Sequence, residues 1–213
     1  MQSDLISEPI ITLQKGVTLL RGFLSKEQQL KALEQARTIL QSAPLFTPRM
    51  KDGTSFRQNL SNCGEFGWIA DANCYRYIHT HPITGKRWPD LPQDWQDIAE
   101  KSLAAIKLPA CHFQSCLFNW YKFPNGRLGM HQDKTEKDLK SPIVTISLGN
   151  PCSFKVAETR NSASQTITLY SGDILIMHGE GRMAWHGVMK LLPTNEPLTR
   201  VPGRLSLTLR KVE

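Results

Sequence analysis

The sequence has no apolar run of the roughly 20 residues that are needed to cross a bilayer. Its first residues, MQSDLISEPIITLQKG, have no basic start followed by a long apolar stretch, so we expect no secretory signal. Internal repeats and low-complexity tracts are also missing. We therefore expect a cytoplasmic protein that does not associate with membranes.

Cysteine is sparse, and its pattern excludes two classes of small protein. The five cysteines contain no CxxC pair, and their odd number argues against a disulfide framework or a zinc ribbon. Reduced thiols fit a cytosolic protein. At 213 residues the chain can bury a core without disulfide or metal cross-links. We predict a single domain over residues 1–213.

Acidic residues are fewer than basic ones. The chain has 26 Lys and Arg against 19 Asp and Glu, a formal charge of +7 and a pI near 9.3. This balance favours a polyanionic partner such as nucleic acid, although a generic basic surface would give the same numbers.

Helical patterns come early in the chain. Residues 17–20 predict a short strand, after which Ser25 and Gln28 form a capping-box pattern at the start of a helix. The apolar positions of this helix are Leu30, Leu33, Ala36 and Leu40. A second helix is expected from about Gln93 to Ile106. The segment between them, 44–92, is rich in Gly, Pro, Asn and aromatic residues and predicts turns and short hairpins that form a lid.

The rest of the sequence favours strands, because its segments have β-branched or alternating character and are bounded by turn residues. The expected strands are 115–123, 142–149, 153–157, 166–177, 183–188 and 204–212. Helices followed by many short strands indicate an α+β fold whose core is an antiparallel sandwich or jelly roll.

His131 and Asp133 form an HxD pair. In an extended segment, residues two apart point to the same side, so both can reach one ion. His186 is a candidate third ligand, although a histidine in a strand can also be an ordinary core residue. Two histidines and one carboxylate leave open positions that suit a non-haem Fe(II) enzyme.

The C-terminal RLSLTLR places Arg204, Ser206, Thr208 and Arg210 on one face of a strand and leucines on the other. Buried arginines need anionic partners, and a dicarboxylate such as 2-oxoglutarate supplies them. A solvated basic face on an edge strand is the alternative.

The strand LFNWY places Leu117, Asn119 and Tyr121 on one face and Phe118 and Trp120 on the other. The amide and the phenol can donate hydrogen bonds to a carboxylate of the cosubstrate. The two residues on the opposite face are expected to lie in the core.

The order NWY, HQD, AWHG, RLSLTLR resembles the AlkB family of Fe(II)/2-oxoglutarate dioxygenases. The resemblance runs from about residue 15 to the C-terminus. Its most specific stretches are NCGEFGW, HQDKTEKDLKSPIVTISLG, YSGDILIMHGEGRMAWHG and RLSLTLR.

The resemblance implies a double-stranded β-helix, a jelly roll that holds the metal at its open end. An N-terminal helix and a nucleotide-recognition lid would occupy about 15–92, and a helix with the catalytic core 93–213. The implied iron ligands are His131, Asp133 and His186. The implied 2-oxoglutarate contacts are Asn119, Tyr121, Arg204, Ser206 and Arg210; Ser206 stands where the best-known members carry Asn.

The resemblance also implies contacts to a flipped alkylated base. Trp68 would stack on the base, with further nucleotide contacts from Tyr75, Arg76, Tyr77 and Arg160. Thr135 departs from the family, whose bacterial member has HQDKDE where this chain has HQDKTE. The residue at 135 contacts the exocyclic amine of the base in the family, so the substrate preference is left open.

The implied activity is oxidative dealkylation of N-alkylated bases in DNA or RNA, in the repair of alkylation damage. It would use Fe(II), 2-oxoglutarate and O2, release succinate, CO2 and formaldehyde, and be carried out by a monomer. Three alternatives stay open. They are a related dioxygenase acting on a protein, lipid or small molecule, a nucleic-acid-binding module with a vestigial metal site, and a generic β-rich binding protein.

Overall fold

The computed structural model describes residues 10–50, 52–71 and 74–213. Within these ranges the chain forms two α-helices, one short 3-10 helix and thirteen strands. The helices are α1 (Lys26–Ser42), α2 (Gln93–Ala105) and η1 (Gly179–Met183). In the described part of the chain, neither α-helix combines the length and the apolar character that a membrane span requires.

Seven strands form the larger of two facing sheets, and every pairing in it is antiparallel. In spatial order they are β1 (Ile10–Gln14), β2 (Val17–Leu20), β11 (Ile174–Met177), β8 (Ile143–Gly149), β13 (Gly203–Arg210), β6 (Ser115–Lys122) and β3 (Asn59–Gly64).

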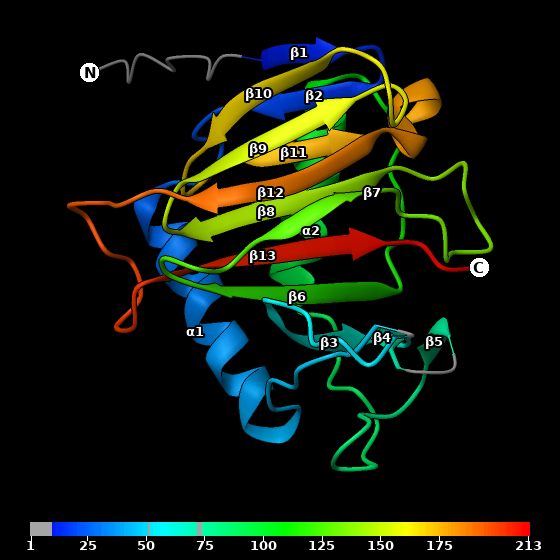
Figure 1. The fold of residues 1–213 in the computed structure, drawn as a ribbon, viewed down its shortest axis with the longest axis vertical. Coiled ribbons are helices and arrows are strands. Elements are labelled where there is room, and N and C mark those ends of the chain that lie inside the picture. Colours follow the sequence, from blue (N-terminus) through cyan, green and yellow to red (C-terminus); the bar gives the residue numbers. More distant parts are fainter. Residues whose placement is uncertain (1–9, 51, 72–73) are drawn as a thin grey trace.

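Four strands form the smaller sheet, in front of the larger one in Figure 1. They are β10 (Ser164–Leu169), β9 (Cys152–Ala157), β12 (Trp185–Leu191) and β7 (Leu128–His131). A core between the sheets joins Val17, Leu19 and Leu175 of the large sheet to Phe154 and Val188 of the small one. Two antiparallel sheets packed in this way confirm the predicted jelly roll.

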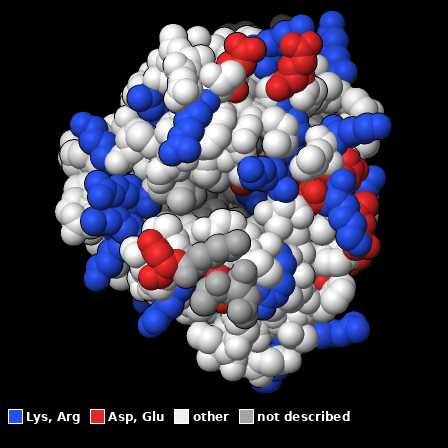
Figure 2. All heavy atoms as spheres, turned by 45° about the vertical axis from the view of Figure 1, so that its right-hand side comes forward, with Lys and Arg blue, Asp and Glu red and all other residues white. Residues whose placement is uncertain are grey.

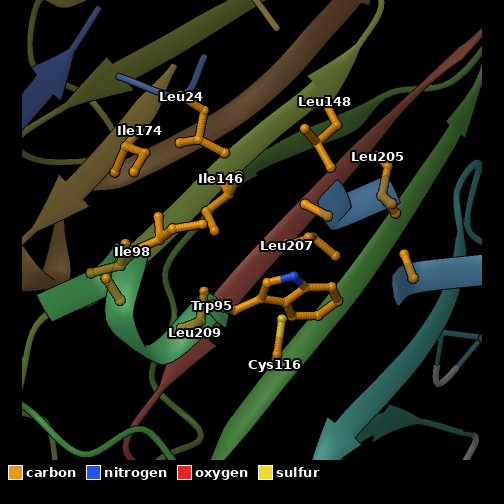
Figure 3. Packing of buried hydrophobic residues seen from close by; sticks show 14 of the residues in the cluster. Leu24, Trp95, Ile98, Cys116, Ile146, Leu148, Ile174, Leu205, Leu207 and Leu209 are labelled. Carbon is orange, nitrogen blue, oxygen red and sulfur yellow. The ribbon is translucent and has the colours of Figure 1, made fainter. Parts of the chain in front are cut away.

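Both helices cover the outer face of the large sheet (Figure 1). The indole of Trp95 on α2 is fully buried against Leu207, Leu209 and Cys116 (Figure 3). The leucines of β13 therefore face the helices, as the alternation in RLSLTLR predicts. The polar face of the same strand is left to point between the sheets.

The capping box at the start of α1 is present. Ser25 Oγ accepts from the backbone N–H of Gln28, whose side chain accepts from the backbone N–H of Ser25. The expected apolar stripe is partly wrong, because Leu30 is 49% exposed. The buried face contains Gln29, Ala32, Leu33, Ala36 and Ile39, and Leu30 lies one residue, about 100°, off that face.

The single strand predicted over 166–177 is two strands in different sheets. β10 ends at Leu169 in the small sheet and β11 begins at Ile174 in the large one. The chain turns between them with Gly172 at a φ of +89°, which favours glycine. Asp173 fixes the turn, since its carboxylate accepts from the backbone N–H groups of Gly22 and Tyr170.

The segment 44–92 is only partly the surface lid that its composition predicts. Its strand β3 is largely buried and pairs with β6 at the edge of the large sheet. The hairpin of β4 (Gly67–Ala70) and β5 (Tyr75–Ile78) packs over a small separate core that includes Leu60, Ile69 and Trp88. The regular β-sheet register of β3 was hidden by its Asn and Gly residues, which are uncommon in strands.

Candidate active site

Two histidines face each other across neighbouring strands of the small sheet. In the antiparallel pairing of β12 with β7, His186 lies directly opposite His131. Their ring centroids are 4.4 Å apart. Gly187 permits this close approach, because a Cβ at that position would lie 2.7 Å from the carbonyl oxygen of Leu128.

Both imidazole rings are held in the same tautomer. Nδ1 of His131 lies 2.9 Å from the carbonyl oxygen of Gly129, and Nδ1 of His186 lies 3.0 Å from that of Ala184. A carbonyl only accepts, so each Nδ1 must carry the proton and donate it. Each Nε2 then keeps its lone pair, which is the state that a metal ligand needs.

Asp133 follows the end of β7 and points its carboxylate at both rings. Its Oδ1 lies 3.7 Å from Nε2 of His131, and its Oδ2 lies 3.6 Å from Nε2 of His186. Burial by itself would raise the pKa of Asp133, but Arg210 and the two histidines hold it well below its usual range. The carboxylate is therefore ionised. Burial also lowers the pKa of His186 to about 4, so this ring is neutral near pH 7.

The three side chains fit a metal ion. Their ligand atoms all lie within 4.8 Å of one another, in the one such group found among the described residues. Two neutral imidazoles and a carboxylate on one side of an ion are the donor set of non-haem Fe(II) enzymes, and they leave coordination positions open. The structure thus brings together the three residues predicted from the sequence.

A pocket runs from these residues into the space between the sheets. Its walls carry all of the residues predicted for the cosubstrate, with apolar side chains between them. These residues are Asn119 and Tyr121 of β6 and Arg204, Ser206 and Arg210 of β13. Strand register explains the grouping, because Arg204 pairs with Tyr121 and Ser206 with Asn119. Phe118 and Trp120 pack on the opposite, helix-covered face, as predicted.

Arg204 fits an anionic ligand that enters this pocket. The residue is 1% exposed, and its Nη2 donates to Ser147 Oγ at 2.7 Å. Its Nε and Nη1 have no hydrogen-bond partner among the described residues. A buried guanidinium with two free donors is costly unless an anion binds it, and a carboxylate accepts from such a pair.

Arg210 differs from Arg204 in that protein side chains already bind it. Its Nη2 donates to Asp133 Oδ2 at 2.7 Å, and its Nη1 lies 3.3 Å from Glu136 Oε1. Glu136 is buried and also accepts from Arg182 Nη2 at 3.2 Å. Arg182 in turn donates to the carbonyl oxygen of Asp133 at 2.7 Å. Glu136, on the loop after β7, and Arg182, on η1, support Asp133 from behind, and neither was predicted from the sequence, since charged residues in loops are usually solvated.

The lid hairpin carries an aromatic pair. The ring of Trp68, half-buried on β4, lies 5.5 Å from that of Tyr75 on β5. Trp68 Nε1 donates to Thr135 Oγ1 at 3.2 Å, which links the hairpin to the loop after β7. An aromatic face with a hydroxyl at its edge can stack on a base and hydrogen-bond its rim.

Tyr77 on the same hairpin is half-buried and reaches the loop after β7. Its hydroxyl donates to Glu136 Oε1 at 2.6 Å and lies 3.3 Å from Arg210 Nη1. Burial raises the pKa of this phenol, so it stays protonated and can donate. Tyr77 therefore joins the lid to the group that supports Asp133.

Two predicted phosphate contacts lie near the surface. Arg76 pairs with Asp71 at 2.7 Å, and Arg160 lies over the ring of Trp185, 5.6 Å from its centroid, beside His186. The ends of β7 and β13 and the start of β12 lie at the right of Figure 1. Figure 2 turns that side forward and shows Lys and Arg on several sides of a hollow.

Comparisons with known proteins agree with this geometry. Residues 16–210 match the model of the 2OG-Fe(II) oxygenase superfamily. An "Alpha-ketoglutarate-dependent dioxygenase AlkB homolog" of Caulobacter vibrioides is 33% identical over 98% of this chain and 92% of its own length. The "DNA N(6)-methyladenine demethylase ALKBH1C" of Arabidopsis thaliana is 29% identical over 93% of this chain and 49% of its own. The solved structure of OsALKBH1 superposes with a TM-score of 0.85 and 29% identity over 95% of this chain and all of that one.

Proposed function

Because this chain belongs to the 2OG-Fe(II) oxygenase superfamily, and within it to the AlkB family, we propose which residues serve the reaction and how the substrate is held. The protein is a dioxygenase that uses Fe(II), 2-oxoglutarate and O2 to dealkylate nucleic acids oxidatively. The proposal concerns the iron ligands, the cosubstrate contacts and a flipped base in the pocket.

His131, Asp133 and His186 would hold Fe(II) through two Nε2 atoms and a carboxylate oxygen. The observation that carries the rest is the pair of free donors on buried Arg204, which lines the same pocket. These donors would bind the distal carboxylate of 2-oxoglutarate, with Asn119 and Tyr121 beside it. Ser206 would add a small polar group, and Arg210 would hold the orientation of Asp133.

When bound, Fe(II) with 2-oxoglutarate and O2 supplies the oxidation of an N-alkyl carbon, and 2-oxoglutarate leaves as succinate and CO2. The protein's own part is positioning. Trp68 would stack on a base turned out of its strand, Thr135 would hydrogen-bond the edge of that base, and Tyr75 would extend the aromatic wall. Apolar side chains along the pocket, among them Leu128 and Phe154, exclude water.

The nucleic-acid backbone would be held by basic side chains around the hollow. Arg160, held over Trp185, and Arg76 on the lid are the residues we assign to phosphate contact. A net charge of +7 supports binding to a polyanion. The protein would act in repair of alkylation damage; the cytoplasmic location and the monomeric state stay predictions from the sequence.

The test is a turnover assay. Protein loaded with Fe(II) and 2-oxoglutarate without oxygen is mixed with a panel of methylated oligonucleotides, air is admitted, and succinate and formaldehyde are measured. We expect formaldehyde from a methylated oligonucleotide, none from the unmethylated strand, and none with His131→Ala. Succinate formed without formaldehyde from any oligonucleotide would point instead to a protein or small-molecule substrate.

A further inference from the structure

A short arm of the chain, residues 46–50 and 52–60, lies beside the lid hairpin. Arg49 pairs with Ser55 across the arm in an isolated β-bridge. The backbone N–H of Arg49 also donates to the carbonyl oxygen of Ala70, at the end of β4, at 3.4 Å. The arm is therefore tied to the lid hairpin through its backbone.

The arm adds a third ring to the aromatic pair of the lid. The ring of Phe56 lies 6.5 Å from that of Tyr75, centroid to centroid, and meets it at 68°. Tyr75 in turn contacts Trp68, whose Nε1 donates to Thr135. We call these three residues the aromatic row. In the order of these contacts, Phe56 is the member of the row farthest from Thr135.

All three rings of the aromatic row keep part of their surface in water. Tyr75 is 43% exposed, and Trp68 and Phe56 are half-buried. Large aromatic side chains usually bury most of their surface, as Trp95 does under the large sheet. Contiguous apolar surface that stays exposed is typical of a place where a ligand binds.

The charges on the arm favour a polyanion. Arg49 and Arg57 are exposed, and within the part of the chain that the structure describes neither forms an ion pair. The acidic residue of the arm, Asp52, accepts a hydrogen bond from the backbone N–H of Thr54. Aromatic rings beside basic side chains are the combination that binds single nucleic-acid strands, because the bases stack while the cations attract phosphate.

From the aromatic row and its charged surroundings we propose that Phe56 is a second stacking site, which holds the base next to the alkylated one. The inference rests on the proposed function, since it assumes that the alkylated base stacks on Trp68. Every base has a π-face, so this site would accept any of the four ordinary bases. Phe56 would thus contribute to affinity for the strand and not to the choice of the alkylated base.

The test removes the neighbouring base and the ring in turn. Fluorescent oligonucleotides of one sequence contain a single methylated base, with either both neighbouring bases intact or one of them replaced by an abasic residue, on the 5′ or the 3′ side. Fluorescence anisotropy measures their affinity for protein loaded with Mn2+ and 2-oxoglutarate. The variants are Phe56→Leu, which keeps apolar bulk, and Phe56→Tyr, which keeps the ring.

Tyr170→Leu is the matched control. Tyr170 is 48% exposed and follows the end of β10 that pairs with Cys152, whereas His186 pairs with Val156 toward the other end of the small sheet. Its loss removes an exposed aromatic ring outside the aromatic row. We expect its affinities to equal those of wild type.

Wild type should lose affinity by about tenfold when the neighbour on one side is abasic, the usual effect of one stacked base. Phe56→Leu should bind the intact oligonucleotide about tenfold more weakly, and should lose nothing further with that abasic neighbour. Phe56→Tyr should restore the dependence on the neighbouring base.

Two results would overturn the inference. If Phe56→Leu weakens binding of intact and abasic oligonucleotides equally, the ring only braces Tyr75; if wild type is indifferent to both neighbours, no second base is stacked. Failure of wild type to bind any of the methylated oligonucleotides would contradict the proposed function itself, and the inference with it.

Discussion

The hydroxyl of Tyr77 donates to Glu136 Oε1 at 2.6 Å and thereby fastens the lid hairpin to the loop that carries Asp133. Tyr77→Phe keeps the ring and removes this bond to a charged acceptor, which we expect to loosen the lid. The KM for a methylated oligonucleotide should rise by about tenfold, while Co2+ binding at the histidines changes little. Steady-state kinetics and cobalt absorption measure the two effects separately. An unchanged KM would mean that the lid is held by other contacts.

Replacing Arg204 should separate cosubstrate binding from stability. Arg204→Met keeps an apolar stem and removes a guanidinium that has two free donors. The affinity for 2-oxoglutarate should fall by about 100-fold or more, measured by calorimetry with Mn2+ in place of iron. The free energy of unfolding without cosubstrate should stay the same or rise, because an uncompensated buried charge is gone. A variant that is both unstable and normal in affinity would contradict the assignment.

Glu136 should matter for stability more than its position on a loop suggests. Glu136→Ala removes the shared partner of buried Arg182 and Arg210, and we expect the free energy of unfolding to fall by about 3–5 kcal/mol. Glu136→Gln is the matched control, since the amide keeps an acceptor oxygen in place. Urea denaturation compares them. If Glu136→Ala lowers the free energy of unfolding less than Glu136→Gln does, solvent enters and hydrates the two arginines.

The turn at Gly172 provides a test of backbone fit. Gly172 and Gly85 both have positive φ values, +89° and +67°. A Cβ on Gly172 would lie 2.5 Å from Gln29 Nε2 and 2.9 Å from the carbonyl oxygen of Leu24, whereas a Cβ on Gly85 meets nothing within 4 Å. Gly85→Ala should lower the free energy of unfolding by about 1 kcal/mol through its positive φ alone. Gly172→Ala should lower it clearly more. Equal losses in thermal unfolding would mean that the turn moves to make room.

Patterns with a period of two residues gave the most reliable predictions. Alternation alone placed Asn119, Tyr121, Arg204 and Arg210 on the pocket face, because a strand in a two-sheet fold must separate its two sides. The capping box likewise placed the start of α1 at Lys26. These features depend on neighbours in the sequence, so the sequence was sufficient to predict them.

Features that depend on distant parts of the chain were missed. The turn at 170–173 was read as part of one strand, because contacts from distant residues such as Arg21 and Gly22 to Asp173 help to hold it. The hydrogen bond from the Tyr77 hydroxyl to Glu136, 59 residues away, was not predicted. A helical wheel likewise could not show that Gln29, and not Leu30, lies on the buried face of α1. The buried position of Gln29 depends on the distant Ser171, whose hydroxyl donates to it.

The strand β7 is the edge of the small sheet, with β12 as its one partner, and the facing histidines lie on these two strands. An ion held by both rings would act as a cross-link that closes the chain between residues 131 and 186, a loop of 186 − 131 = 55 residues. Such a closure removes conformational entropy from the opened state. Amide hydrogens of β7 should therefore exchange with deuterium more slowly once metal is added, so the catalytic ion also secures the free edge of the sheet.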